Sequence, residues 1–171
     1  MRIGNYLCIV ACAALLLLSS SFKPAEPSYE VVFFLAPKCP ICQDYALQMR
    51  TLHNEFSDAG FNFVGVFPND HTKQEDIAWF KEYYEIPFSL KKGDQSLARK
   101  LNASVTPEVF VLDSEGNVLY EGRIDNTYAR IGQRRTKTTT SELRDAIEAL
   151  NENRTIEISK TQSVGCIIEY R

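Results

Sequence analysis

The chain has 171 residues, of which 44% are hydrophobic, 24% charged and 11% aromatic, a composition typical of a globular domain and unlike a disordered or repetitive chain. Five cysteines are too few for a mini-protein held together by disulfides, and a chain of this length can bury an apolar core. The net charge of −3 argues against nucleic acid or an anionic membrane surface as the main partner.

Residues 1–21 are predicted to be a signal peptide. Arg2 precedes an uncharged stretch, and the apolar run from Tyr6 to Leu18 ends in three serines. This run is shorter than the roughly 20 residues that a membrane-spanning helix needs. We therefore expect export to a periplasm or the cell exterior. An uncleaved leader or a lipid anchor on Cys12 would be the only means of membrane attachment, and the lipid anchor is disfavoured because the apolar run continues to Leu18.

The mature chain is expected to form one folded domain. Residues 22–28 are a linker, residues 29–152 the domain, and residues 153–171 a C-terminal tail. Removing the leader also removes Cys8 and Cys12, so that an odd number of cysteines remains. Because disulfides persist in an exported protein, the unpaired cysteine needs an explanation.

The domain opens with a predicted β-α-β unit. Tyr29–Leu35 is a continuous apolar run, typical of a strand buried on both faces. Pro40 suits a first helical turn, and apolar residues then recur at helical spacing until Gly60. Phe61–Phe67 is the second strand, which should lie parallel to the first with a right-handed crossover.

Further elements are expected after this unit. They are a helix from Thr72 that ends before Pro87, a short helix with Leu97 and Leu101, a hairpin of strands 108–113 and 118–120, a solvated loop over 130–140, and a last helix. The last helix is predicted to begin at a capping box of Thr139 and Glu142 and to bury Leu150. Alternating strands and helices indicate an α/β fold with a mixed sheet.

Cys39 and Cys42 flank Pro40 and Ile41 where the first strand meets the first helix. A helix N-terminus carries unpaired N–H groups and a partial positive charge, which stabilise a thiolate. A thiolate is the attacking species in thiol–disulfide exchange. Cys39 is therefore the predicted nucleophile and Cys42, one helical turn later, the resolving cysteine, while Pro40 holds the turn and Ile41 offers apolar contact.

A zinc half-site or a structural disulfide is the alternative interpretation of this pair. A structural zinc site needs four ligands, whereas the mature chain adds only Cys166, His53 and His71, with no second paired motif. Redox chemistry is the preferred interpretation, and it requires no metal and no organic cofactor.

Three segments carry a family resemblance: FFLAPKCPIC, FKEYYEIPFSL and VTPEVFVLDSEGNVLYEGRID. In this order, over about Tyr29 to Leu150, they resemble the thioredoxin-like superfamily, especially its secreted TlpA-like and redoxin (AhpC/TSA-related) branch. The resemblance implies a central mixed β-sheet flanked by α-helices, with a helical insertion before a hairpin that follows a cis-proline. It places Thr106 and Pro107 beside the cysteine pair, as the wall against which a substrate strand pairs.

The sequence also departs from the thioredoxin pattern. Lys38 stands in place of the tryptophan before the first cysteine, and Phe33 in place of a buried acid. Glu108 is an alternative proton acceptor, and the charge of Lys38 is expected to favour the Cys39 thiolate. Ala36 occupies the place of the threonine with which peroxiredoxins bind peroxide, which disfavours peroxidase activity.

Cys166 lies in the C-terminal tail, beside Gly165. A packed apolar thiol is one interpretation. Since some redoxin relatives end in a similar Gly-Cys tail, we favour a tail that returns over the domain. Cys166 is then a third exchange partner or an attachment point, and not a permanent partner of Cys39.

The sequence thus predicts an exported thiol–disulfide oxidoreductase. Its substrates are expected to be disulfides or dithiols of other proteins, and a redox partner is needed to complete the cycle. We expect a monomer with no nucleic-acid partner. A thiol peroxidase, or a non-catalytic thioredoxin-fold module that binds a metal or a partner, remains as the alternative.

Overall fold

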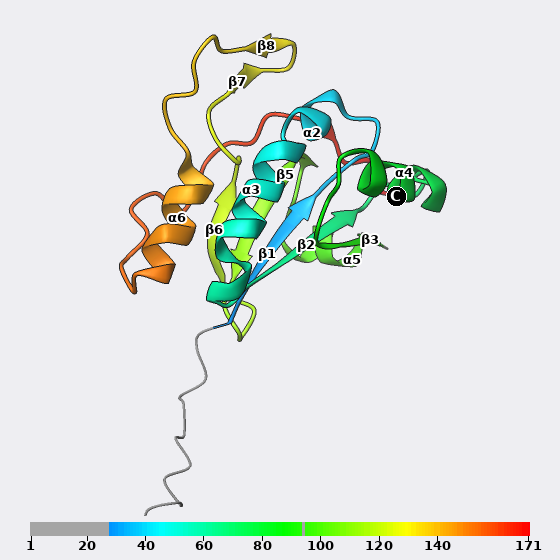
Figure 1. Ribbon diagram of the computed structural model, residues 1–171. Helices are drawn as coiled ribbons and strands as arrows, with labels where there is room; N and C mark the ends of the chain where they lie inside the picture. Colours follow the sequence, from blue (N-terminus) through cyan, green and yellow to red (C-terminus); the bar gives the residue numbers. More distant parts are fainter. Residues whose placement is uncertain (1–27, 94) are drawn as a thin grey trace, which may run out of the picture.

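The computed structural model describes residues 28–93 and 95–171 (Figure 1). The predicted signal peptide, and the linker up to residue 27, lie outside the described residues. Within the described part of the chain, none of the helices has the length and apolar character required to cross a membrane.

A five-stranded mixed sheet forms the centre of the domain, in the order β3-β2-β1-β5-β6 (Figure 1). Its strands are β1 (Tyr29–Phe34), β2 (Phe61–Phe67), β3 (Ser89–Lys92), β5 (Glu108–Leu112) and β6 (Val118–Gly122). β1, β2 and β3 run parallel, whereas β5 pairs antiparallel with both β1 and β6. The predicted parallel unit and the hairpin are confirmed, while the edge strand β3 was not expected.

The helices are α2 (Pro40–Asp44), α3 (Ala46–Phe56), α4 (Gln74–Tyr83), α5 (Ser96–Lys100) and α6 (Glu142–Asn151), with a 3₁₀ turn at Ser57–Ala59. The single helix predicted after Pro40 is divided at Tyr45, where ψ is −4° instead of a regular helical value. Hydrogen bonding continues across the division, because the Met49 N–H donates to the Tyr45 carbonyl at 3.0 Å. Gly60 ends this segment with a left-handed φ of 91°.

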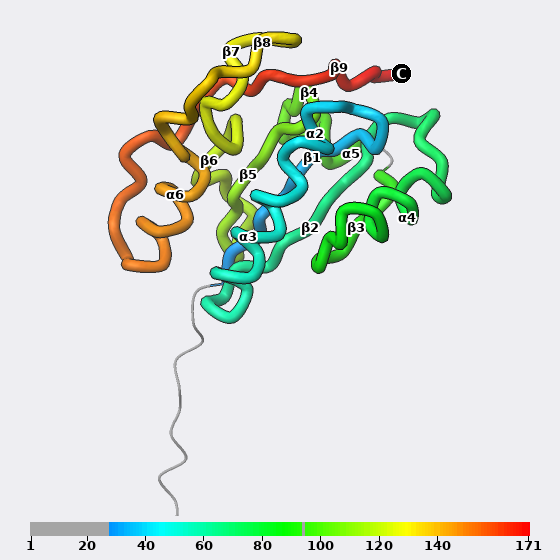
Figure 2. The backbone as a smooth tube through the Cα atoms, turned by 45° about the horizontal axis from the view of Figure 1, so that its top comes forward, coloured from blue at the N-terminus to red at the C-terminus, as the bar shows by residue number. Residues whose placement is uncertain are grey.

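The sheet is buried on both faces, as the continuous apolar strands predict. On one face Phe33, Met49 and Ile147 belong to a core closed by α2, α3, α4 and α6. On the other face Phe34 packs in a second cluster with α5 and with Ile168 of the tail. The C-terminal tail therefore contributes Ile168 to the core of the domain, and Figure 2 shows the tail running across the domain.

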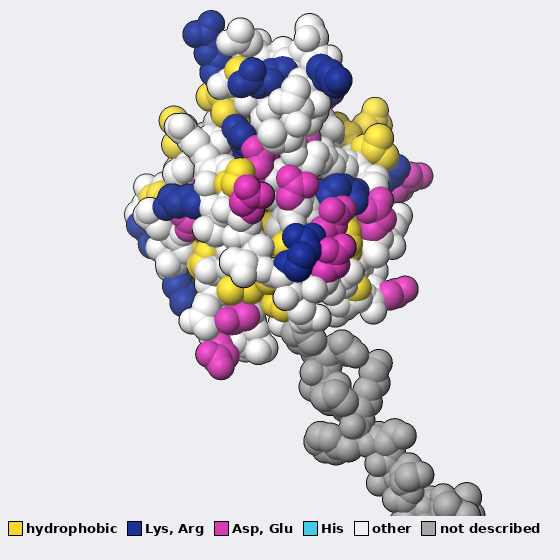
Figure 3. Space-filling model, turned by 90° about the vertical axis from the view of Figure 1, so that its left-hand side faces the viewer, with side chains coloured by type: hydrophobic (Ala, Val, Ile, Leu, Met, Phe, Trp, Pro, Cys, Tyr) yellow, Lys and Arg dark blue, Asp and Glu magenta, His cyan; other side chains and the backbone are white. Residues whose placement is uncertain are grey.

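Two small sheets lie at the end of the domain that carries α2 (Figure 2). β4 (Val105–Thr106) pairs with β9 (Cys166–Ile167) of the tail, and β7 (Tyr128–Arg130) pairs with β8 (Gln133–Arg134). The expectation of a simple loop over 130–140 is therefore wrong at its start, where a hairpin forms. The hairpin region is exposed and basic, and Figure 3 shows Lys and Arg side chains gathered at its end of the molecule.

The capping box predicted for the last helix does not form. Ser141 is the N-cap of α6 and makes no side-chain capping bond. Glu142 is buried and binds the Arg123 guanidinium and, at 2.6 Å, the Thr140 hydroxyl. The Glu142 carboxylate thus pairs with Arg123, which directly follows β6, instead of capping its own helix. A buried carboxylate needs such a charged partner.

Candidate active site

Cys39 and Cys42 lie where β1 leads into α2. Cys39 is the N-cap of α2 and Pro40 occupies its first turn, as the sequence indicates. Cys39 is only 3% exposed and Cys42 is 0% exposed. The Ala36 N–H donates to the Cys42 sulfur at 3.5 Å, so the loop before α2 also holds the second thiol.

The Thr106–Pro107 peptide lies beside this pair and is cis, as the family resemblance implies. In its protonated form the Cys39 thiol donates to the Thr106 carbonyl oxygen, which is 3.3 Å from the sulfur. Thr106 is fully buried. The amino end of α2 and the segment before β5 therefore meet through the Cys39 sulfur and the main-chain carbonyl of Thr106.

The structure also brings Cys166 to this place. β9 pairs antiparallel with β4, which sets Cys166 opposite Thr106. The Thr106 hydroxyl donates to the Cys166 carbonyl oxygen at 3.3 Å. In the described part of the chain, Cys39, Cys42 and Cys166 are free thiols, and Cys166 lies more than a hundred residues after the other two in the sequence.

The three thiols have very different acidities. A hydrogen bond from the Cys42 thiol, and a weaker one from the Cys166 thiol, lower the pKa of Cys39 to about 5 against the opposing effect of burial. Burial raises the pKa of Cys42, and it raises that of Cys166 to about 12 with a further contribution from the Cys39 sulfur. At neutral pH, Cys39 is therefore the thiolate of the group.

Two neighbours in the motif differ in what they present. Pro40 is exposed, whereas Ile41 is only 5% exposed and packs in the core.

Lys38, the residue before the first cysteine, is engaged elsewhere. Its ammonium group pairs with the Asp76 carboxylate on α4 at 3.1 Å. The causes that lower the pKa of Cys39 are thiol and main-chain hydrogen bonds, and Lys38 is not among them.

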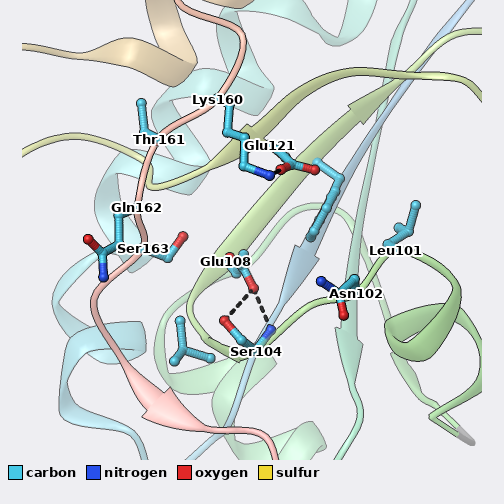
Figure 4. Close-up of a pocket in the computed structure, with 11 residues that line it drawn as sticks. Leu101, Asn102, Ser104, Glu108, Glu121, Lys160, Thr161, Gln162 and Ser163 are labelled. Atoms are coloured by element: carbon cyan, nitrogen blue, oxygen red, sulfur yellow. Dashed lines mark hydrogen bonds and ion pairs between the residues drawn. The ribbon is translucent and has the colours of Figure 1, made fainter.

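Glu108 lies at the start of β5 and lines a cavity of about 550 Å³ with Ser104, Glu121 and Lys160 (Figure 4). Its carboxylate accepts a hydrogen bond from the Ser104 N–H at 2.7 Å. In Figure 4 the carboxylate points toward Ser104, on the segment before β4. The described contacts of Glu108 thus connect it to this loop and not to the thiols, and its expected proton-accepting role stays a prediction.

A group of polar aromatic residues that sequence reasoning missed lies next to the thiols. The Tyr45 hydroxyl donates to buried Asp125 at 2.6 Å, and the Tyr45 and Tyr128 rings are 5.9 Å apart. Burial and a hydrogen bond to Asp44 raise the pKa of Tyr128 to about 12, with a smaller contribution from Cys39. No motif marks these residues, because the β7–β8 hairpin that carries Tyr128 has no strong strand pattern.

The histidines do not join the cysteines. The Nδ1 atom of His71 lies 3.5 Å from a carboxylate oxygen of Glu169. The ring of His53 contacts the rings of Phe63 and Phe88. Within residues 28–93 and 95–171, no group of three His, Cys, Asp or Glu side chains is arranged to hold a metal ion.

Comparison with known proteins places this site in a family context. The Redoxin family model matches residues 25–133. No curated protein sequence matches the chain significantly. An uncharacterised conserved protein from Geobacillus kaustophilus is similar in structure, with a TM-score of 0.74 and 23% identity over 88% of this chain and 82% of that one.

Two further solved structures share the architecture. A thioredoxin-like protein from Aeropyrum pernix has a TM-score of 0.56 at 18% identity, over 74% of this chain and 80% of that one. A secreted disulfide oxidoreductase from Mycobacterium tuberculosis has a TM-score of 0.53 at 17% identity, over 71% and 81%. At such identities the likeness concerns the fold, and it confirms the expected thioredoxin-like α/β architecture.

Proposed function

The chain belongs to the redoxin family, and from that premise we propose that it is a thiol–disulfide oxidoreductase with Cys39 as nucleophile and Cys42 as resolving cysteine. The observation that carries this proposal is the Cys39 sulfur, whose pKa is lowered to about 5 while it lies 3.3 Å from the carbonyl of Thr106. Such a sulfur is ionised at neutral pH and faces main chain that an extended substrate can pair with.

The reaction proceeds by two exchanges. The Cys39 thiolate attacks one sulfur of a substrate disulfide, forms a mixed disulfide and releases the other substrate sulfur as a thiolate. Cys42 then loses its proton and attacks Cys39, which frees the second substrate sulfur and leaves the Cys39–Cys42 disulfide. The released substrate thiolate takes up the proton that Cys42 loses, so that the step balances. The reverse sequence oxidises a substrate dithiol.

Thr106 and Pro107 are the proposed substrate wall, and Pro40 is the exposed residue of the motif beside it. We propose disulfides or dithiols of other exported proteins as substrates, a separate redox partner, and a monomeric enzyme outside the cytoplasm. The signal-peptide pattern of residues 1–21 supports export.

Reduction of a model protein disulfide, such as insulin, by dithiothreitol tests the proposal. Wild type should accelerate the reaction, and Cys39→Ser should abolish the acceleration because serine supplies no thiolate at neutral pH. Circular dichroism of the variant controls for folding. Equal rates with wild type and Cys39→Ser would contradict the proposal, and so would peroxide consumption without disulfide reduction, which would favour a thiol peroxidase.

A further inference from the structure

The tail of this protein occupies the edge at which the proposed substrate strand would pair. β9 forms an antiparallel ladder with β4, in which Cys166 faces Thr106 and Ile167 faces Val105. The tail passes over the domain close to β4 and the start of α2 (Figure 2). A chain segment with a cysteine thus takes the place of a substrate segment with a cysteine.

Gly165 permits this close pairing. A Cβ atom on residue 165 would lie 2.1 Å from the Thr106 carbonyl oxygen and 2.6 Å from its carbon, and both are main-chain atoms. Any larger residue would push the tail away from β4. The absence of a side chain at this one position therefore allows Cys166 to reach the site.

Cys166 and Cys39 meet at the same residue, Thr106. Thr106 contacts both residues, through its carbonyl to the Cys39 sulfur at 3.3 Å and through its hydroxyl to the Cys166 carbonyl at 3.3 Å. Each of the two thiols also affects the pKa of the other, which is lowered for Cys39 and raised for Cys166. Cys166 and Val164 pack on the core cluster that contains Cys39. Cys39 itself is only 3% exposed.

From this geometry we propose that Cys166 is a third redox cysteine, which forms a reversible disulfide with Cys39 within one chain and acts as a built-in substitute for a substrate cysteine. The proposal rests on the proposed function of Cys39 as the nucleophile. A protein substrate must displace β9 to reach the same sulfur, because both use the edge of β4.

The exchange conserves electrons and atoms. Starting from the Cys39–Cys42 disulfide, the Cys166 thiol gives up its proton and the thiolate attacks the Cys39 sulfur. The Cys39–Cys166 bond forms as the Cys39–Cys42 bond breaks, and Cys42 leaves as a thiolate that takes up a proton. The two disulfides are isomers, so no external oxidant or reductant is consumed. In the oxidised protein Cys39 carries no charge, which removes one of the causes that hold Cys166 protonated.

Disulfide mapping of the Cys42→Ser variant tests this proposal without any activity assay. The full chain is equilibrated in a glutathione redox buffer, quenched with acid, alkylated and analysed by peptide mass mapping. We expect a Cys39–Cys166 bond within one chain. Introducing Gly165→Val into the same variant should lower the ratio of this disulfide to the dithiol by about tenfold or more, because a displaced tail loses its high effective concentration.

Ile167→Ala in the Cys42→Ser background is the matched control, since Ile167 lies on β9 but its side chain is 73% exposed. It should leave the disulfide ratio unchanged. Free Cys166, glutathione adducts on both cysteines, or only interchain bonds in Cys42→Ser would overturn the proposal, as would equal ratios with and without Gly165→Val. The insulin assay of wild type and Cys39→Ser reports separately on the proposed function, so failure of one proposal is distinguishable from failure of the other.

Discussion

At the scale of single residues, hydrogen bonding to neighbouring cysteines lowers the pKa of Cys39 against the opposing effect of burial. The N-cap place was predictable, because a strand-to-helix boundary and Pro40 mark it in the sequence. The hydrogen bonds that lower its pKa come from Cys42 and Cys166, and the second of these depends on a long-range pairing. Sequence spacing therefore predicts Cys39 as the nucleophile and locates Cys42, but it does not locate Cys166 beside them.

The contribution of Cys166 can be measured by titration. In wild type, ultraviolet thiolate absorbance of the reduced protein should show Cys39 ionising near its pKa of about 5, well below the other two thiols. Cys166→Ala removes a hydrogen-bond donor and should raise this midpoint, whereas Cys166→Ser retains a hydroxyl donor and should raise it less. An unchanged midpoint in Cys166→Ala would contradict the thiol contact.

The same pKa sets the sign of a pH effect on the stability of the reduced protein. The pKa of Cys39 is lowered from 9.0 when unperturbed to about 5 in the fold. The ionised thiol therefore stabilises the fold fully above about pH 9, and this contribution is lost as the pH falls to about 5. Unfolding of reduced wild type and Cys39→Ser by urea at several pH values should show the difference between them shrinking toward acid pH.

At the scale of elements, the elements with strong apolar patterns were predictable and the polar ones were not. β1, β2, β5 and β6 carry buried apolar residues, so periodicity and turn signals locate them. The edge strand β3 has the sequence SLKK and lacks such a pattern. β4 and β9 contain two residues each and form only because the tail returns, which no local signal encodes.

Phe33 of β1, which stands where thioredoxins have a buried acid, is one of the apolar residues by which the strand is recognised in the sequence. Phe33 of β1 is 0% exposed, with its ring 6.3 Å from that of Phe63 and 5.8 Å from that of Phe88. Phe33→Ala should reduce the free energy of unfolding by about 3–5 kcal/mol, because it leaves a cavity between rings. Denaturant unfolding measures this value, with the exposed strand residue Val118→Ala as control; a loss below about 1 kcal/mol would contradict tight packing here.

At the scale of the whole molecule, the fold brings a helix N-terminus, a cis-proline segment and the C-terminal tail to one end of the sheet (Figure 2). The helix N-terminus was predictable because it directly follows a strand, and the cis-proline segment was predictable from the family resemblance. The tail was expected to return over the domain, but its register against β4 was not predictable. That register decides which thiol Cys166 meets, and Gly165 makes it sterically possible.

The whole arrangement sets the reduction potential of the Cys39–Cys42 pair. A thiolate that is stabilised at neutral pH stabilises the dithiol relative to the disulfide, so the disulfide becomes more oxidising. The Cys39 pKa of about 5 lies between those of the thioredoxin and DsbA nucleophiles, at about 7 and about 3.5. We therefore expect a potential between about −270 and about −120 mV, measured by equilibration with glutathione and acid trapping.

The pH dependence of that potential tests the assignment of the thiolate. Between about pH 6 and pH 8, Cys39 is already ionised and Cys42, whose pKa is raised, is not, so reduction by two electrons takes up one proton. The potential should then fall by about 30 mV per pH unit, half the value of about 60 mV for two protons. A slope near the larger value would mean that Cys39 is protonated over this range, and the hydrogen bonds from the other two thiols could not then be its source of acidity.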